Sequence, residues 1–289
     1  MKCPVDIESL YNDYIAAKNE ENYKDRYEGK ENYYHASGGG SCSRKLYFES
    51  VEQVATTNPT NRDSNRILRL GTIVHNDFEL CLRKLQGNRI LEKERKEVSS
   101  PVTTIYSNTI DSNTNHSNTT YSKEKEIHYL EKESFEFHVE NEIFLPDLNV
   151  RGFYDLVCVS DNDGSVYLID FKTMANFSWS RKFGWKNPDT NPSIHQEIQL
   201  ATYGLFVEKE FGRLDGMFLY FYNKDNSKMR PVEVPLTMLR RAKNFWINVN
   251  EEHKKGLPSF REGVSPVQDW NCRYCRFLDH CKPPFFKKK

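Results

Sequence analysis

Two short stretches near the middle of the chain, Gly152-Phe153-Tyr154-Asp155 and Leu168-Ile169-Asp170-Phe171-Lys172, decide the fold. Apolar residues and an Asp-Gly turn lie between them, which predicts the two antiparallel strands of a hairpin. Because side chains alternate along a strand, Asp170 and Lys172 project to the same face. Pairing of the two strands places Asp155 near Asp170.

Two carboxylates so close together repel each other unless a cation lies between them. Hard oxygen ligands suit Mg²⁺ or Mn²⁺, which polarise a phosphate and lower the pKa of a bound water. Lys172 would add a fixed positive charge. The alternative is a strand end that merely meets solvent. However, Asp170 directly follows an apolar run, residues 166–169, that we expect to be buried. The pattern therefore favours metal-dependent phosphodiester cleavage.

Composition limits the classes of protein that fit. The chain has 289 residues, with 41 Lys and Arg against 41 Asp and Glu. The net charge therefore gives no support for a protein that coats nucleic acid, and any DNA contact must come from a local basic groove. The absence of a long apolar stretch or signal peptide predicts a soluble, cytoplasmic protein without membrane contact, in a bacterial or archaeal cell or of viral origin.

Periodicity predicts further elements around the hairpin. Gly38-Gly39-Gly40 lacks the Gly-Lys-Ser/Thr ending of a phosphate-binding loop, so we expect a flexible link into a helix. Ser193 and Gln196 predict a capping box at the start of a helix. The expected helices cover 6–20, 64–85 (ended by Gly87), 193–212 and 236–255, and the other strands cover 134–145 and 217–222.

The motif order resembles that of the RecB-type branch of the PD-(D/E)XK nuclease superfamily: Gly152 to Asp155, then Asp170-Phe171-Lys172, then Gln199 to Tyr203. The resemblance implies a restriction-endonuclease-like α/β core, in which helices flank a mixed central sheet. Its implied ligands for Mg²⁺ or Mn²⁺ are His75, Asp155, Asp170 and the backbone carbonyl of Phe171. It implies Asp155, Asp170, Lys172, Gln199 and Tyr203 as catalytic residues. Glu142, ahead of Glu140, is a further acidic candidate, or else part of a solvated strand face.

Cys272, Cys275 and Cys281 form a compact group that needs a fourth ligand. His280 would complete a tetrahedral Zn²⁺ site, and the distant Cys42 is the other candidate. The spacing resembles iron–sulfur members of the same branch, including AddB-type helicase-nucleases and CRISPR-associated Cas family four exonucleases. That resemblance implies a [4Fe–4S] cluster on Cys42 and the three C-terminal cysteines, joining the N- and C-terminal segments.

Aromatic and basic residues alternate between residues 177 and 186. They could stack bases and follow the phosphates of a single strand, or form an aromatic lid packed on the core. The residues concerned are Phe177, Trp179, Arg181, Lys182, Phe183, Trp185 and Lys186, with Arg44, Lys45, Arg62, Arg66 and Arg69 expected on the other side.

We therefore expect a single nuclease domain over residues 1–289. It would comprise an N-terminal helical segment (1–63), a catalytic core (64–255) with a mobile insertion at about 99–125, and an iron–sulfur cysteine tail (256–289). The expected function is a metal-dependent exonuclease that acts on single-stranded DNA ends. The alternatives are a structure-specific endonuclease, a non-catalytic DNA-binding adaptor and a zinc-stabilised protein with coincidental motifs. A protein partner in recombination, replication or CRISPR adaptation fits this expectation.

Overall fold

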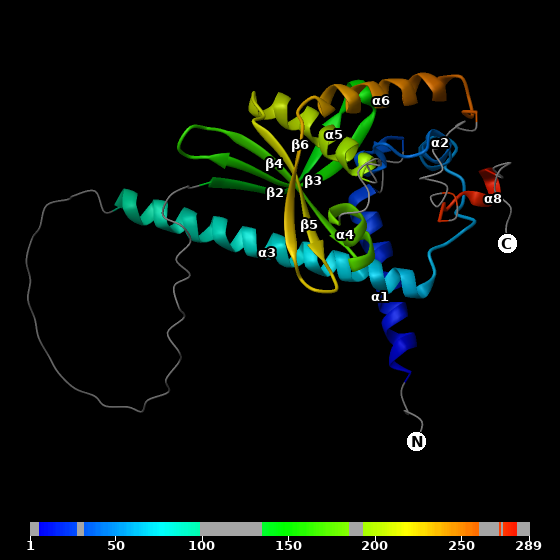
Figure 1. Ribbon diagram of the computed structural model, residues 1–289, viewed down its shortest axis with the longest axis horizontal. Coiled ribbons are helices and arrows are strands. Elements are labelled where there is room, and N and C mark those ends of the chain that lie inside the picture. Colours follow the sequence, from blue (N-terminus) through cyan, green and yellow to red (C-terminus); the bar gives the residue numbers. More distant parts are fainter. Residues whose placement is uncertain are drawn as a thin grey trace, which may run out of the picture.

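The computed structural model describes residues 6–27, 32–98, 135–184, 193–259, 272 and 274–281 (Figure 1). The predictions for Trp185, Lys186 and residues 99–125 fall outside this part of the chain. The elements are α1 (Ile7–Tyr27), β1 (Tyr34–His35), η1 (Ala36–Gly38), α2 (Ser43–Ser50), α3 (Arg62–Val98), β2 (Phe135–Leu145), η2 (Pro146–Leu148), β3 (Val150–Ser160), β4 (Val166–Met174), α4 (Asn176–Phe183), α5 (Ile194–Phe211), β5 (Gly216–Asn223), β6 (Met229–Val234), α6 (Met238–Lys254) and α8 (Leu278–Cys281).

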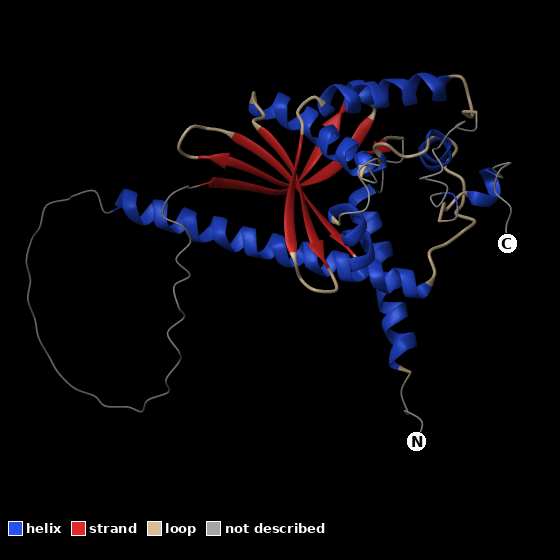
Figure 2. Ribbon diagram, viewed as in Figure 1, coloured by secondary structure: helices blue, strands red, loops and turns tan. Residues whose placement is uncertain are grey.

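The strands form one mixed sheet, which confirms the predicted α/β class (Figure 2). Its order is β1-β3-β4-β5-β6, and β2 pairs with β3 as well. The β3–β4 hairpin is antiparallel, as expected, and α4 and α5 connect β4 to its parallel neighbour β5. Within the described residues, no helix is long and apolar enough to cross a membrane.

Helices cover both faces of the sheet. On one face, Val157 and Leu168 belong to a buried cluster with Trp246 of α6. Leu156 lies on the other face, where Leu82 of α3 packs against its cluster. The alternation along β3 thus presents apolar side chains to helices on both sides. This arrangement confirms the prediction of a central sheet flanked by helices (Figure 1).

Strand β4 separates from β3 part-way along their hairpin. The ladder between β3 and β4 reaches only as far as Leu156 and Ile169. β2 pairs with β3 over nearly its whole length, so β1 must occupy the same edge of β3 as β4. β1 pairs with residues 150–151 of β3 only. Residues 152–155 therefore lie at a gap in this edge, between β1 and β4.

The glycine run before α2 packs tightly against α5, which corrects the prediction of a flexible link. A Cβ atom on Gly39 would lie 3.0 Å from the backbone nitrogen of Gln199, and one on Gly152 would lie 2.8 Å from the Cβ of Ala36. Only glycine allows backbones to approach so closely. These contacts hold the start of α5 beside the gap in the sheet.

Three local expectations were wrong for physical reasons. α3 continues through Gly87, where a Cβ atom would meet no other atom within 4 Å, so nothing there obstructs the helix. Ser193 makes no capping bond, because its hydroxyl instead accepts a hydrogen bond from Lys182 at 2.7 Å. Periodicity also missed β1, which is only two residues long, and β6, an exposed edge strand that contains Pro231.

Candidate active site

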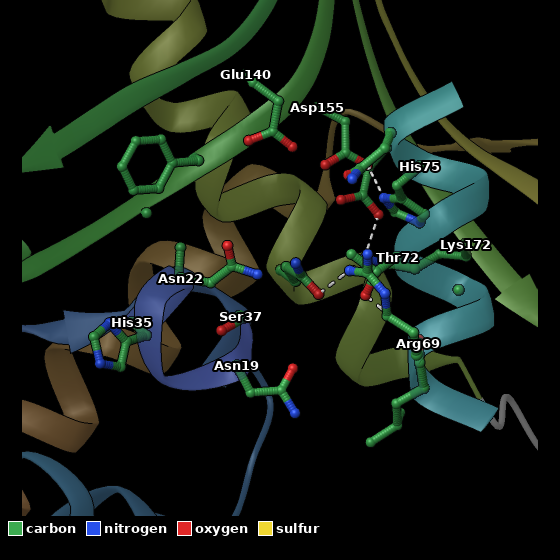
Figure 3. A pocket seen from close by; sticks show the side chains of 18 of the residues that line it. Asn19, Asn22, His35, Ser37, Arg69, Thr72, His75, Glu140, Asp155 and Lys172 are labelled. Atoms are coloured by element: carbon green, nitrogen blue, oxygen red, sulfur yellow. Dashed lines mark hydrogen bonds and ion pairs between the residues drawn. The ribbon is translucent and has the colours of Figure 1, made fainter. Parts of the chain in front are cut away.

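A cavity of about 750 Å³ opens where β3 and β4 separate. The predicted residues that line it come from three elements: Asp155 from β3, Asp170 and Lys172 from β4, and Gln199 and Tyr203 from α5. His75 of α3 also lines the cavity, beside Asp155 (Figure 3). The structure therefore gathers all six predicted side chains around one space.

A chain of polar contacts links four residues of the cavity lining. Lys172 Nζ lies 2.6 Å from Asp170 Oδ2 and donates a hydrogen bond to Gln199 Oε1 at 3.2 Å. Gln199 Nε2 in turn lies 2.9 Å from the hydroxyl of Tyr203, one helical turn further along α5. The orientation of the lysine is thus fixed from both sides, by a carboxylate and by an amide.

Beyond Ile169, β4 no longer forms backbone hydrogen bonds with β3, and the side chain of Asp155 bonds to the β4 backbone instead. The backbone N–H of Phe171 donates to Asp155 Oδ2 at 2.6 Å. Because the N–H and C=O of one strand residue point to the same edge, the carbonyl of Phe171 also faces the gap. The same Asp155 oxygen lies 3.7 Å from His75 Nδ1.

α3 packs against β4 through contacts on either side of His75. Phe78 stacks on Phe171 with ring centroids 4.8 Å apart. A Cβ on Gly71 would lie 2.8 Å from Thr173 Oγ1, so glycine allows the close approach of the helix. Gly71, His75 and Phe78 share one face of α3. This packing directs the imidazole toward Asp155.

Burial dominates the electrostatics of the site. Asp170 is 1% exposed, and burial raises its pKa to about 6, although Lys172 acts in the opposite direction. Burial alone would lower the pKa of Lys172, but Asp170 and Asp155 outweigh it and raise that pKa. Lys172 therefore stays protonated at neutral pH. Asp170 Oδ2 accepts no well-aligned hydrogen bond within the described residues, despite its ion pair with the lysine.

Glu140, and not Glu142, lines the cavity. Glu142 forms an ion pair with Arg151 at 3.1 Å. Glu140 has a φ of 53° inside β2, in the left-handed region that non-glycine residues rarely adopt. Val139 and Ile143 belong to clusters on opposite faces of the sheet, so the strand switches faces near this residue. The preference for Glu142 is corrected for that reason.

The side of the cavity opposite Asp155 is lined by residues from segments that carry no catalytic motif. α1 contributes Asn19 and Asn22 there (Figure 3), and Lys18 of α1 and Arg276 of the C-terminal segment also line the cavity. No motif marks these residues, because long-range packing alone brings them to the cavity. Arg69, which was predicted, also lines the cavity, from α3 on the same side as His75 (Figure 3).

The other predicted DNA-binding residues that the structure describes do not line the cavity. Arg44 is buried, and its Nη1 donates to the carbonyl of Pro258 at 2.5 Å, so its prediction is corrected. Lys45 is half-buried beside α5. Trp179 packs at a tilt against Phe183 and the core. Arg181 is exposed, whereas Lys182 is half-buried and bonded to Ser193.

A family comparison agrees with this geometry. The model of the PD-(D/E)XK nuclease superfamily matches residues 36–282, which include every motif residue around the cavity. The chain belongs to the PD-(D/E)XK nuclease superfamily. No curated protein matches it.

Two solved structures resemble this PD-(D/E)XK nuclease at low sequence identity. A protein called SSO0001 is 16% identical with a TM-score of 0.47, over 96% of this chain and 98% of its own. A candidate exonuclease from Eubacterium rectale is 14% identical with a TM-score of 0.41, over 93% and 94% of the two chains. Likeness at this level carries no functional argument.

The nuclease brings three of its four predicted cluster cysteines together. Burial raises the pKa of Cys275, and nearby Cys42 and Cys281 raise it further. Cys272 lies three residues before Cys275, whose N–H donates to the Cys272 carbonyl at 3.3 Å. Among the residues that the structure describes, no three His, Cys, Asp or Glu side chains are arranged so that they could hold a metal ion.

The buried pair of Asp170 and Lys172 gives a testable pH dependence. Replacement of Lys172 by Met leaves a buried carboxylate without its cation, so we expect the unfolding free energy of the metal-free protein to fall by roughly 3 kcal/mol at pH 8. Lys172 lowers the pKa of Asp170, so its removal raises that pKa further: the carboxyl is protonated at pH 5 and its buried charge costs stability only as the pH rises. The loss should therefore be much smaller at pH 5. Urea unfolding at both pH values measures it.

The control for this experiment is the double variant Asp170→Asn, Lys172→Met, in which both charges of the pair are removed. We expect it to recover most of the lost stability at pH 8. An equal loss for Lys172→Met at pH 5 and pH 8 would show that the charge of Asp170 is not the cause.

Proposed function

We propose that the protein is a metal-dependent exonuclease that hydrolyses phosphodiester bonds at the ends of single-stranded DNA. The observation that carries this proposal is the juxtaposition of Asp155, Asp170 and Lys172 in one cavity. A buried ion pair is seldom more stabilising than apolar residues of the same size. A non-catalytic adaptor with the same fold would gain nothing from this pair, whereas phosphodiester hydrolysis uses both charges.

The cavity lining supplies donor atoms of the kinds that a divalent cation binds, although no three of these side chains converge in the described structure. Asp155, Asp170 and Glu140 offer carboxylate oxygens, Phe171 offers a carbonyl, and His75 an imidazole. Burial and the nearby carboxylate of Asp155 raise the pKa of Asp170, so a cation between the two carboxylates would be favourable. Oxygen-rich donors suit Mg²⁺ or Mn²⁺, and the imidazole favours Mn²⁺ somewhat. When bound, such an ion polarises the phosphate and makes water more acidic.

The protein's own side chains supply orientation and charge. Lys172, kept protonated by the two aspartates, can neutralise negative charge that develops on the phosphate during attack by water. Gln199 accepts a hydrogen bond from the ammonium and fixes its direction, and Tyr203 holds Gln199. In this assignment Lys172 acts on the phosphate, and Gln199 and Tyr203 are positioning residues.

The shape of the cavity supports an unpaired strand as substrate. A volume of about 750 Å³ is within the range of pockets that hold small molecules. α1 bounds it with the amides of Asn19 and Asn22 (Figure 3). Amides both donate and accept hydrogen bonds, so they suit the exposed edges of unpaired bases. A structure-specific endonuclease would need the same chemistry, and the position of the label in the cleavage assay separates the two.

The test is digestion of end-labelled single-stranded and duplex DNA with Mn²⁺ or Mg²⁺. We expect cleavage by the wild type and a rate at least about 10²-fold lower for Asp170→Asn, Lys172→Ala, because that variant loses both charges at the phosphate. Glu142→Gln, a carboxylate change on β2 away from the cavity, should cleave normally. Glu140→Gln should be impaired. A folded wild type that cleaves nothing with either ion would favour the adaptor.

We also propose that Cys42, Cys272, Cys275 and Cys281 hold a [4Fe–4S] cluster with a structural role. The thiols of Cys42 and Cys281 lie near enough to Cys275 to raise its pKa, which supports the proposal, although no three of these side chains converge in the described structure. The alternative of zinc with His280 as the fourth ligand stays open: its Nε2 donates to the carbonyl of Ala55 at 2.9 Å, which leaves Nδ1 as the nitrogen that could bind the metal. The cluster would join segments far apart in sequence, within a single nuclease domain. A protein partner and a cytoplasmic location stay predictions.

Metal analysis of anaerobically purified protein tests this cluster. We expect about four iron atoms per chain and a brown colour for the wild type. Cys272→Ala should lose the iron, together with solubility and DNA binding. Cys81→Ala is the matched control, because Cys81 is an exposed cysteine on α3. Stoichiometric zinc in place of iron, or full iron content in Cys272→Ala, would contradict the assignment.

A further inference from the structure

Besides Lys172, three cations from three separate segments line the catalytic cavity. They are Lys18 of α1, Arg69 of α3 and Arg276 of the C-terminal segment. The carboxylates lie in the same cavity, so a ligand can contact both groups. Arg276 is placed between Cys275 and the buried Phe277, in the segment assigned to the cysteine site.

Backbone contacts fix Arg276 in this position. Its carbonyl accepts hydrogen bonds from the N–H groups of Thr57 and Asn58 at 2.9 and 3.0 Å. The Asn58 side chain also donates to the carbonyl of Cys275 at 3.1 Å. The C-terminal segment is therefore held along residues 57–58. This docking carries a guanidinium into a cavity whose other residues come from the first 203 positions.

The positive charges are only partly neutralised by the protein. Glu21 forms an ion pair with Lys18 at 2.5 Å on the exposed surface of α1. Neither Arg69 nor Arg276 forms a side-chain ion pair with any residue that the structure describes. Arginine presents several donors in a fork that matches the oxygens of a phosphate. Cations gathered in a cleft raise the local concentration of anions.

We propose that Lys18, Arg69 and Arg276 form a subsite for the phosphate backbone of the substrate strand, beside the reacting phosphate. In this arrangement the docked cysteine segment sets the position of Arg276, which couples the integrity of that segment to substrate affinity. The inference rests on the proposed nuclease function for its ligand. The contrary interpretation is that these cations are ordinary solvated surface charges.

Fluorescence anisotropy with a labelled single-stranded oligonucleotide tests the subsite. The inactive variant Asp170→Asn, Lys172→Ala is the background, with Mg²⁺ present, so that binding is measured without cleavage. Each phosphate contact to a single strand contributes about 0.7 to the slope of log affinity against log salt. We expect Arg276→Ala to lower that slope by about this amount and to weaken binding severalfold at low salt.

Arg240→Ala is the matched control, because it removes an exposed arginine from α6, outside the cavity. We expect the background slope to be unchanged by it. Arg276→Lys should retain the slope while losing part of the affinity, since it keeps the charge but not the fork. An unchanged slope for Arg276→Ala, or an equal change for Arg240→Ala, would overturn the subsite.

Asn58→Ala tests the positional part of the proposal. It keeps every cation but removes the bond to the Cys275 carbonyl, so weaker binding is expected. If Arg276→Ala weakens binding and Asn58→Ala does not, the claim that docking sets Arg276 is wrong. Failure of the nuclease proposal looks different: the wild type would not cleave DNA, whatever the salt slopes.

Discussion

The separation of β4 from β3 beyond Leu156 and Ile169 is the constraint on which the site depends. A continued ladder would bury the backbone groups of Phe171 and leave no room between the strands. Instead, the carboxylate of Asp155 satisfies the Phe171 N–H, and a cavity opens beside it. Glycine at position 152 lets η1 and α5 fill the far side of the gap. The fold thus exposes polar groups at one defined place in a buried sheet.

Without a bound ligand, the charges in this gap lower the stability of the protein. The side chain of Asp170 is buried, and Lys172 offsets the cost of burying its charge only in part. The pKa of Asp170 is therefore raised to about 6. Strain at Glu140, in the left-handed region within a strand, adds a further cost. Proteins accept such features mainly at functional sites. A cation among these carboxylates would remove much of their mutual repulsion.

The local part of the site could be predicted from sequence. Alternation along β4 placed Asp170 and Lys172 on one face, and helical spacing joined Gln199 to Tyr203. Glu140 could not be identified in this way, because a regular strand assigns it to the same face as Glu142. The position of Arg276 at the cavity depends on the docking of the C-terminal segment along residues 57–58, and no local sequence pattern encodes such a contact. Sequence patterns describe elements well, but not the places where elements depart from regularity.

The gap between β3 and β4 is, on this interpretation, a divalent-cation site. Crystals soaked in Mn²⁺, with diffraction data collected at the manganese absorption edge, test this central claim most directly. We predict an anomalous difference peak between the carboxylates of Asp155 and Asp170, and no such peak for Asp155→Asn. A cavity without a peak in the wild type, or manganese bound only elsewhere on the protein, would contradict it.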